Sequence, residues 1–362
     1  MRRTGRPPTI VDVARLSGVS KSTVARALAD DDGIAEATRE HVLKVARAAG
    51  YERNRLAVGM RSGRSGLFGL VIPDIANPFW AEVARGAQDR AQEAGSSLMI
   101  LSSDWDHELE SQHLRTLRQA RVDGAIVNPV ADNFDDLHRF GLPFVLIGSS
   151  AERFPETSSV GSDIAQAVRL GLDYLVANGH VRPWLLLGPR WRIARARFLR
   201  TVHDHCVERD VDPAGLPTEE GEYTVTGGHD AMVRILEREK SAHICVFAAN
   251  DLMALGAMMA VREAGGRCPD DVSLLGFDGV PAGAFAWPGL TTIEKPARAM
   301  GRRAVECLFD EIAGRADHVR LFLPSRLIVR GSVADHADLS TRGPQPALAQ
   351  PLAGVPAPAR VE

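Results

Sequence analysis

The sequence has few cysteines, few aromatic residues and no long apolar run. Four of its 362 residues are cysteines, and 6% are aromatic. No stretch reaches the roughly 18–20 consecutive apolar residues that a membrane-spanning helix needs, so we expect no contact with a membrane. The cysteines form no Cys-x-x-Cys pair, which predicts reduced thiols and neither a zinc site nor a redox motif: Cys206, Cys245, Cys268 and Cys307.

The sequence also lacks a secretory signal and the signatures of common enzyme classes. The start MRRTGRPPTIVDVA is basic, but no apolar segment follows it, which predicts a cytoplasmic protein. No G-x-G-x-x-G follows an apolar run, and G-x-x-x-x-G-K-[ST], G-x-S-x-G and H-E-x-x-H do not occur. His203 and His205 are two apart, which on a helix points them to different faces. We therefore expect no catalytic residue, no cofactor and no metal site.

Charge is distributed unevenly along the chain. Residues 1–65 hold 13 Lys and Arg against 7 Asp and Glu, a net charge of +6, and the remaining residues hold 30 against 39, a net charge of −9. A small basic head on an acidic body favours an interaction between the head and a polyanion. An ordinary solvated basic surface would give the same charge balance.

The chain divides by composition into four segments. We expect a helical head at residues 1–50, a hinge at 51–65, an α/β body at 66–333 and a tail at 334–362. Five prolines follow Arg342, and the tail has no periodic apolar face, so we expect it to be disordered.

The body alternates short apolar runs with stretches long enough for a helix. Alternation of this kind predicts parallel sheets covered by helices on both faces. The spacing lengthens near residues 150–180, so we expect two α/β lobes with a ligand cleft at the carboxyl ends of their strands. The runs are LFGLVI (67–72), LMIL (98–101), GAIV (124–127), FVLI (144–147), WLLLG (184–188), HICVFA (243–248) and SLLGFD (273–278).

The head carries the start and stop signals of two short helices and a third, longer one. Thr9 and Asp12 form a capping-box pattern, and Gly18 ends the helix that follows. Ser20 begins a second helix, KSTVARAL, with Thr23 three residues on. Two short helices joined through a glycine turn are typical of a helix-turn-helix, and a third helix at 36–49 would close its core. Apolar residues expected to pack there are Val13, Ala14, Val19, Val24, Leu28, Val42, Val45 and Ala46.

This packing leaves polar residues on the outer face of the second helix. Arginine can pair with two guanine acceptors at once, lysine also suits guanine, and serine can contact a base or a phosphate. Lys21, Ser22 and Arg26 are therefore candidates to read bases in a major groove. Three solvated polar residues on any helix would give the same pattern.

Longer motifs carry a resemblance to a known family. Five motifs follow one another across residues 9–333: TIVDVARLSGVSKSTVARAL, TREHVLKVARAAGY, RSGRSGLFGLVIPDIANPFWAEV, FAANDLMALGA and DVSLLGFDGVPAGAFAWPGLTTIEKP. In this order they resemble the LacI-type family of bacterial transcription regulators. The resemblance implies a helix-turn-helix head, a hinge and a two-lobed body like a periplasmic binding protein. It also implies three chain crossings between the lobes, near 163–166, 290–294 and 323–326.

The resemblance implies a set of DNA-binding residues. Ala25 and Ala29 replace a serine and an asparagine of the family pattern, and we expect the aspartates at 30–32 to point into solvent. The hinge YERNRLAVGM keeps part of the pattern, with Met60 in place of the leucine that wedges into the minor groove. The implied residues are Thr9, Ser20, Lys21, Ser22, Thr23, Arg26, Asn54, Ala57 and Met60.

The resemblance also implies the residues that bind an effector in the cleft. Arg195 competes with Arg197 for the arginine position, because the segment around them is shorter than usual. Gly148-Ser149 and Ile164 replace an Asp-Arg pair and an asparagine of the family pattern, and Asp251 is expected to cap the helix LMALGAMMAV. The implied residues are Phe79, Trp80, Asp163, Arg197, Tyr223, Asn250 and Asp278.

Taken together, these patterns favour a ligand-responsive transcription regulator of the repressor type. Its expected partners are double-stranded DNA with a pseudo-palindromic operator, a sugar-like small molecule and a second copy of the chain. Two alternatives are a solute-binding protein, which the body favours, and a sugar-processing α/β enzyme. Strong salt-dependent DNA binding would separate the first interpretation from both alternatives.

Overall fold

The computed structural model divides the chain into two compact units, Met1–Gly66 and Leu67–Glu362, which we call the head and the body. The structure describes residues 7–29, 31–51, 64–130, 137, 139–148, 154, 156–190, 193–239, 241, 243–315 and 318–335. The hinge residues Asn54, Ala57 and Met60 and the tail beyond residue 335 therefore lie outside the described residues.

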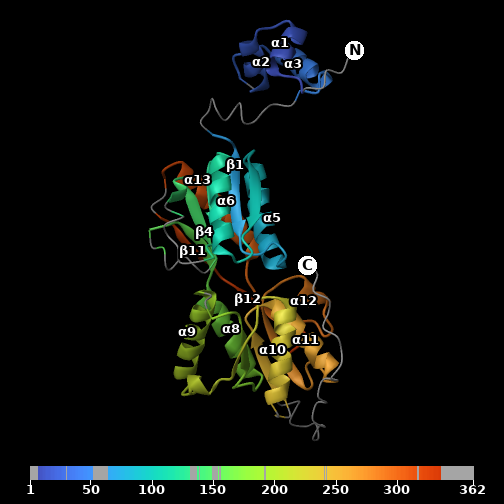
Figure 1. Ribbon diagram of the computed structural model, residues 1–362, viewed down its shortest axis with the longest axis vertical. Helices are drawn as coiled ribbons and strands as arrows, with labels where there is room; N and C mark the ends of the chain where they lie inside the picture. The colour runs from blue at the N-terminus through green and yellow to red at the C-terminus, as the bar shows by residue number, and fades with distance from the viewer. Residues whose placement is uncertain are drawn as a thin grey trace. The chain divides into compact units, whose positions relative to one another are not determined.

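The head consists of three helices, α1 (Ile10–Ser17), α2 (Lys21–Leu28) and α3 (Glu36–Ala48) (Figure 1). The predicted capping box is confirmed, because the Thr9 N–H donates to the Asp12 carboxylate at 2.9 Å and the Asp12 N–H donates to Thr9 Oγ1 at 3.4 Å. Gly18 ends α1 in the left-handed conformation, at φ +70°, where glycine costs least. The N–H of Thr23 donates to Ser20 Oγ, so Ser20 caps α2 as predicted.

One small apolar core holds these helices together. Val13, Val24 and Val42, one from each helix, are fully buried. Ala27 and Ala46 complete the buried cluster, and the other predicted core residues pack against it partly exposed. The helix-turn-helix arrangement predicted from the sequence is therefore confirmed, with α3 ending one residue before the predicted position.

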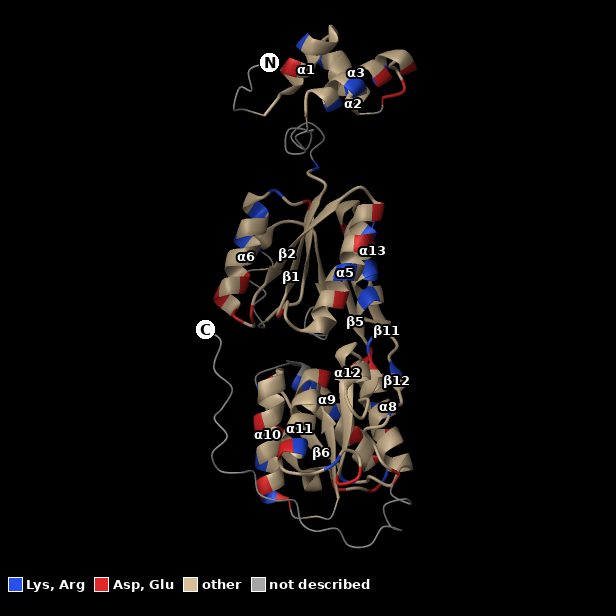
Figure 2. Ribbon diagram, turned by 90° about the vertical axis from the view of Figure 1, so that its right-hand side faces the viewer, with Lys and Arg blue, Asp and Glu red and all other residues tan. Residues whose placement is uncertain are grey.

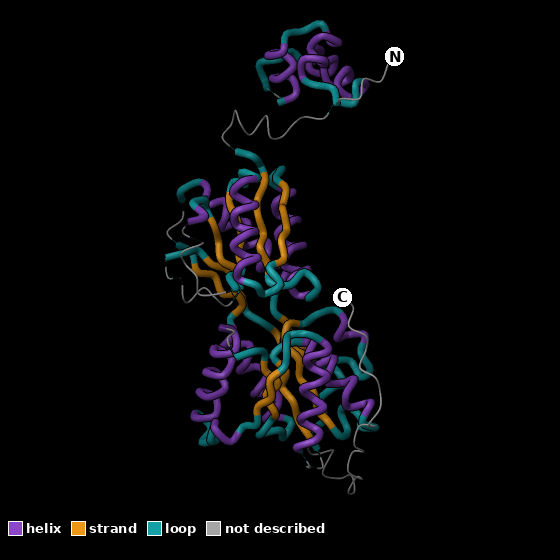
Figure 3. The backbone as a smooth tube through the Cα atoms, viewed as in Figure 1, coloured by secondary structure: helices purple, strands orange, loops and turns teal. Residues whose placement is uncertain are grey.

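The body contains two six-stranded sheets (Figure 3). Sheet A has the order β11-β5-β4-β3-β1-β2, and sheet B has the order β12-β10-β9-β8-β6-β7. Among the described strand pairs, β10 with β12 is antiparallel and the others are parallel. The bounds in sheet A are β1 (Leu67–Ile72), β2 (Ser97–Ser102), β3 (Gly124–Val127), β4 (Phe144–Ile147), β5 (Ser159–Ser162) and β11 (Arg320–Leu323). Those in sheet B are β6 (Trp184–Leu187), β7 (Thr218–Glu220), β8 (Ile244–Ala248), β9 (Val272–Asp278), β10 (Thr291–Glu294) and β12 (Arg326–Ile328).

Helices cover both faces of each sheet, because side chains of a buried strand alternate between its faces. On sheet A, α5 (Pro78–Glu93) and α13 (Ala297–Ile312) pack on one face and α6 (His107–Gln119) packs on the other. On sheet B, α8 (Ile164–Ala177) and α9 (Ile193–Val207) pack on one face. The helices α10 (Val225–Arg238) and α11 (Asp251–Glu263) pack on the other.

Ion pairs join α5 to α13, on whose ribbons Figure 2 colours the positions of Lys, Arg, Asp and Glu. The Arg302 guanidinium donates to both oxygens of Glu93, at 2.8 and 2.9 Å, and Arg298 donates to Asp89 at 2.9 Å.

Among the described residues, no helix is long and apolar enough to cross a membrane.

The chain passes between the sheets three times. The crossings lie between β5 and α8, between β10 and α13, and between β11 and β12. The first and third fall where they are predicted. The second follows Glu294, directly after the predicted span, because that span is itself strand β10.

Candidate functional site

The second helix of the head presents polar side chains to solvent. Lys21 and Ser22 are exposed, and half of the Arg26 side chain is exposed. Ser20 Oγ lies 2.7 Å from Ser22 Oγ and 2.8 Å from Thr23 Oγ1, so one hydroxyl cluster forms at the start of α2. An exposed helix start with hydroxyl and basic side chains is suited to contact DNA.

Asp31 contacts Arg26, contrary to the expectation that it points freely into solvent. Arg26 Nε and Nη2 donate to the two carboxylate oxygens of Asp31 at 3.1 and 3.0 Å. The hydrogen bonds from Arg26 hold the pKa of Asp31 below its ordinary value. The expectation was wrong for Asp31 because the turn after α2 brings its carboxylate to the arginine, whereas Asp32 is exposed as predicted.

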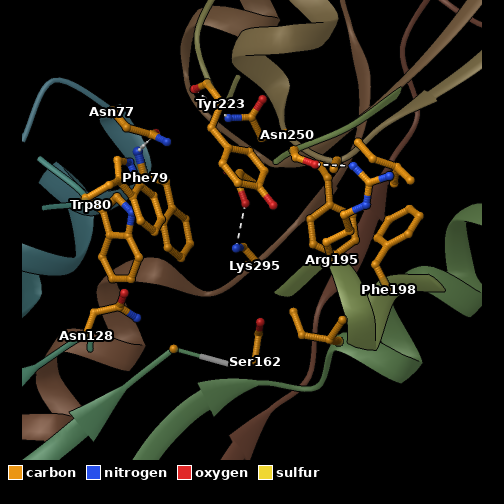
Figure 4. Close-up of a pocket in the computed structure, with 18 of the residues that line it drawn as sticks. Asn77, Phe79, Trp80, Asn128, Ser162, Arg195, Phe198, Tyr223, Asn250 and Lys295 are labelled. Atoms are coloured by element: carbon orange, nitrogen blue, oxygen red, sulfur yellow. Dashed lines mark hydrogen bonds and ion pairs between the residues drawn. The ribbon is translucent and has the colours of Figure 1, made fainter. Parts of the chain in front are cut away.

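The body contains a cavity at the carboxyl ends of its strands, where open α/β sheets bind ligands (Figure 4). From sheet A, the segments after β1, β2, β3, β4 and β5 reach it, and from sheet B the segments after β6 to β10 reach it. Five residues predicted from the sequence line this cavity: Phe79, Trp80, Tyr223, Asn250 and Asp278.

Aromatic rings form the walls of the cavity. The Phe79 and Trp80 rings meet edge to face, with centroids 5.1 Å apart, at the start of α5. Asn77 holds this helix start in place, because its side chain accepts from the Phe79 N–H at 3.0 Å. Across the cavity, Trp105 from the lobe built on sheet A (lobe A) stacks on Tyr223 from the lobe built on sheet B (lobe B), with centroids 6.0 Å apart and ring planes 25° apart. The Trp105 backbone has φ +62°, a conformation that costs a bulky residue energy.

Two glycines make room for side chains in the cavity. A Cβ at Gly148 would lie 2.3 Å from Asn128 Nδ2, so the amide of Asn128 needs glycine at this position. Asn128 donates to the carbonyl of Ile147, which fixes its amide beside the cavity. The departure from the family pattern at Gly148 is therefore coupled to Asn128. A Cβ at Gly188 would lie 2.2 Å from the Tyr223 ring, so Gly188 allows that ring to cover the end of β6.

Asp278 forms a buried ion pair in the lining of the cavity. Its Oδ1 lies 2.6 Å from the ammonium of Lys295, in the crossing between β10 and α13. The same ammonium lies 3.8 Å from the centroid of the Phe79 ring, close enough for a cation–π interaction. Burial raises the pKa of Asp278, and Lys295 opposes that rise. The cation beside this carboxylate is therefore Lys295, which is not among the residues predicted from the sequence.

Of the two competing arginines, Arg195 lines the cavity. Arg195 Nη1 donates to the Gly188 carbonyl at 2.6 Å and to Glu220 at 3.0 Å. Arg197 stacks on Phe322 instead, with its guanidinium 5.3 Å from the ring centroid. Residues two apart on a helix point about 200° apart, so only one of the two can face the cavity.

The carboxylates of Asp163 and Asp251 accept hydrogen bonds from other groups of the fold. The Asp163 carboxylate accepts from the Gln166 N–H at 3.0 Å and caps α8, and its neighbours Ser162 and Ile164 line the cavity. The expectation that Asp251 caps α11 was wrong, because Asn250 is the capping residue. Asp251 is fully buried and instead accepts from Thr292 Oγ1 at 2.6 Å and from the Val280 N–H at 2.7 Å. Burial, followed by the nearby Asp278 charge, raises the pKa of Asp251 to about 7.

Seven polar or aromatic cavity residues are absent from the sequence prediction: Asn77, Trp105, Asn128, Ser162, Phe198, Phe277 and Lys295. Asn77, Trp105, Asn128 and Lys295 each follow a strand within a few residues, so a search of the strand ends for polar and aromatic side chains would find these four. The described residues contain no group of three His, Cys, Asp or Glu side chains arranged to hold a metal ion.

The chain is similar to known proteins along most of its length. Residues 9–54 match the family described as "Bacterial regulatory proteins, lacI family", and residues 172–333 match the "Periplasmic binding protein-like domain". One relative is the HTH-type transcriptional regulator MalR of Streptomyces coelicolor. It is 34% identical over 344 residues, which cover 90% of this chain and 96% of the relative.

Two solved structures share the fold over about nine-tenths of the chain. One is the lac repressor dimer bound to operator and the anti-inducer ONPF, with a TM-score of 0.81 and 27% identity, covering 91% of this chain and all of that one. The other is a complex of the transcriptional regulator CelR with cellobiose, with a TM-score of 0.65 and 29% identity, covering 90% of this chain and 99% of that one.

Proposed function

The chain belongs to the lacI family of bacterial regulatory proteins, and on that premise we propose that it is a DNA-binding repressor controlled by a small molecule. The observation that carries this proposal is the combination, in one chain, of a helix-turn-helix unit and a two-lobed body with a lined cavity. The first supplies contact with DNA, and the second supplies a site for a ligand.

The two alternatives from the sequence are not favoured. The relatives are named as transcriptional regulators and repressors, so neither a solute-binding protein nor a sugar-processing enzyme matches them. A bacterial regulator acts where the chromosome is, and we place this chain in the cytoplasm on that basis.

We propose a pseudo-palindromic operator read by α2. Lys21, Ser22 and Arg26 would contact base edges, and Thr9, Ser20 and Thr23 would lie against phosphates. Asn54, Ala57 and Met60, outside the described residues, would form the hinge contacts with the minor groove. Support comes from the exposed start of α2 and from the operator in the related lac repressor structure.

For the cavity we propose a small hydroxylated ring, such as a sugar. Aromatic faces stack on flat sugar faces, and charged side chains form strong hydrogen bonds with hydroxyls. The related CelR structure holds cellobiose, which fits this chemistry. The proposed contacts are Phe79, Trp80, Tyr223, Asn250 and Asp278, joined by Arg195 and Lys295, with Asp163 and Arg197 as the remaining positions implied by the family.

The ligand would act by favouring one arrangement of the two lobes. The cavity is lined from both lobes, and the Trp105–Tyr223 stack joins them across it. A ligand that binds one arrangement more tightly shifts the population toward it, and the affinity for DNA follows if the two arrangements hold the heads differently.

We also propose that the chain acts as a homodimer. Two large apolar side chains, one at the end of α12 (Ala282–Phe285) and one just after it, are almost fully exposed, Phe285 at 88% and Trp287 at 98%. Exposed aromatic side chains are typical anchors of protein interfaces, and a two-fold axis would bury two copies of this pair. The related lac repressor structure is a dimer.

The test of the proposal is DNA binding by the full chain. A duplex is first selected from a random-sequence pool, and its affinity is compared with that of a scrambled duplex over a range of salt concentrations. We expect tight binding of the selected duplex and a linear fall of log K with log salt. Replacement of Arg26 by alanine should cost about 1–3 kcal/mol on the selected duplex and relax specificity at one base pair.

The matched control is Lys44→Ala, which removes one exposed positive charge from α3. It should leave the preference for the selected duplex unchanged. An equal loss on selected and scrambled DNA for Arg26→Ala would reduce Arg26 to a phosphate contact. No enrichment of any duplex by the wild-type chain would reject the proposed function.

A further inference from the structure

Asp31 is held in place by its own backbone as well as by Arg26. The Asp31 N–H donates to the Arg26 carbonyl at 3.2 Å, and the Asp31 carbonyl accepts from the Ile34 N–H at 3.1 Å and from Arg39 Nη2 at 3.2 Å. Its Oδ1 also accepts from the Gly33 N–H at 2.9 Å. A carboxylate fixed at this many points gives Arg26 a defined partner at the end of α2.

The ion pair uses one edge of the guanidinium and leaves another. Nε and Nη2 each donate once to Asp31, which accounts for two of the five N–H groups of arginine. The edge formed by Nη1 and the second N–H of Nη2 has the spacing that pairs with O6 and N7 of guanine. Arg26 can therefore contact a guanine while Asp31 still holds it.

Stability of the fold does not account for this pair. The Arg26 and Asp31 side chains are 50% and 40% exposed, and exposed ion pairs contribute little to folding. The pair instead lies on the base-reading helix that the proposed function requires. A negative charge beside that helix also opposes contact with phosphates of any sequence.

We propose that Asp31 is a positioning residue for sequence recognition, which fixes the plane of the Arg26 guanidinium toward guanine and weakens binding to other DNA. The inference rests on the proposed function and assigns Asp31 a part in specificity. It also assigns a part to Gly33. A Cβ at Gly33 would lie 2.2 Å from Arg26 Nη2, so a larger residue at this position would move the guanidinium away from its present place beside Asp31.

Two variants disturb the pair in different ways. Asp31→Asn removes the charge but keeps the size of the side chain. Gly33→Ala keeps every charge and displaces the guanidinium, and the backbone of Gly33 lies outside the left-handed region that would strain an alanine. Asp32→Asn is the matched control, because Asp32 is an exposed neighbour with the same charge.

The experiment measures the affinity of the full chain for the selected duplex and for the scrambled duplex at one salt concentration. We expect Asp31→Asn to lower the ratio of the affinity for the selected duplex to the affinity for the scrambled duplex by about tenfold. It should weaken binding to the selected duplex and strengthen binding to the scrambled duplex. A tenfold change is at the lower end of the discrimination that a bidentate arginine–guanine contact supplies. Gly33→Ala should lower the ratio without strengthening binding to scrambled DNA. Asp32→Asn should raise both affinities together and leave the ratio within about twofold.

A second readout separates positioning from a structural effect. In an Arg26→Ala background, Asp31→Asn should no longer change the ratio, because the residue it acts through is absent. The inference is overturned if Asp31→Asn tightens binding to the selected duplex, since Asp31 would then compete with DNA, or if it changes the ratio no more than Asp32→Asn. A wild-type chain that prefers no duplex would reject the proposed function itself, which is a different outcome.

Discussion

At the scale of single residues, two neighbouring carboxylates have unusual surroundings. Asp251 is fully buried among backbone N–H groups and Thr292, and a Cβ at Gly276 would lie 2.1 Å from its Oδ1. Asp278 lies near enough to raise the pKa of Asp251 further. Asp278 also lines the cavity, so the carboxylate that raises the pKa of Asp251 is one of the proposed ligand contacts.

The raised pKa of Asp251 predicts a specific dependence of stability on pH. The pKa of Asp251 is about 7 in the folded chain, whereas its ordinary value of 3.8 applies in the unfolded chain. Between pH 3.8 and pH 7, Asp251 therefore holds a proton in the folded state that it has released in the unfolded state. The contribution of Asp251 is therefore fully present below pH 4 and is lost as pH rises toward 7, by at most about 1.4 kcal/mol per pH unit. Asp251→Asn should remove this part of the slope when unfolding by urea is measured from pH 4.5 to 7.5.

The control for this measurement is Asp230→Asn, at a side chain that is 60% exposed. It should keep the wild-type slope. An Asp251→Asn slope equal to that of the wild type would show that Asp251 is ionised throughout the range and that its burial is compensated.

The sequence could place Asp278 in the site but not its partner. Asp278 ends an apolar run, and the end of a strand in a parallel sheet is a position that sequence alone predicts. Lys295 reaches the same carboxylate from a crossing whose path depends on how the two lobes pack. Arg195 and Arg197 are equivalent in sequence, and only the rotation of α9 about its axis decides which of them faces the cavity.

At the scale of elements, strands with apolar runs were predictable and the others were not. All seven predicted runs form strands. The strands without such runs are short, and they include SVGS in β5, TEE in β7 and TTIE in β10. Their positions are fixed by pairing with neighbours, as β5 is between β4 and β11, rather than by their own side chains.

The exposed aromatic side chains at the end of the short helix α12 predict where two copies of the chain meet. Phe285 and Trp287 are almost fully exposed, an arrangement that a second copy of the chain would cover. Replacing both by serine should shift the chain from dimer to monomer in sedimentation velocity and raise the apparent Kd for the selected duplex at least about tenfold, because two linked heads bind with a higher effective concentration.

The control is Val181→Ser, at another exposed apolar side chain of lobe B. It should leave both the oligomeric state and DNA binding unchanged. A double serine variant that stays dimeric would place the dimer interface elsewhere on the body.

At the scale of the whole molecule, alternation of strands and helices predicted two lobes with a cleft between them. The order of strands within each sheet could not be read from the sequence, because β11 and β12 return from the far end of the chain to pair with β5 and β10. Those returns make the second and third crossings. Residues at two of the crossings, Ser162, Ile164 and Lys295, line the cavity, and we propose that a ligand bound there biases the arrangement of the lobes.

The most direct test of this account compares DNA binding with and without a ligand in the wild type and in Asp278→Asn. The ligand is the compound from a panel of sugars and sugar phosphates that most raises the melting temperature of the wild-type chain. Asp278→Asn keeps the size of the side chain but removes the charge that pairs with Lys295. We predict that the ligand changes the wild-type Kd for the selected duplex at least about tenfold, in the range typical of allosteric coupling. The variant should bind the duplex normally and fail to respond at the same ligand concentration, whereas Asp230→Asn should respond as the wild type does. An undiminished response in Asp278→Asn would contradict the assignment of the cavity as the site that controls DNA binding.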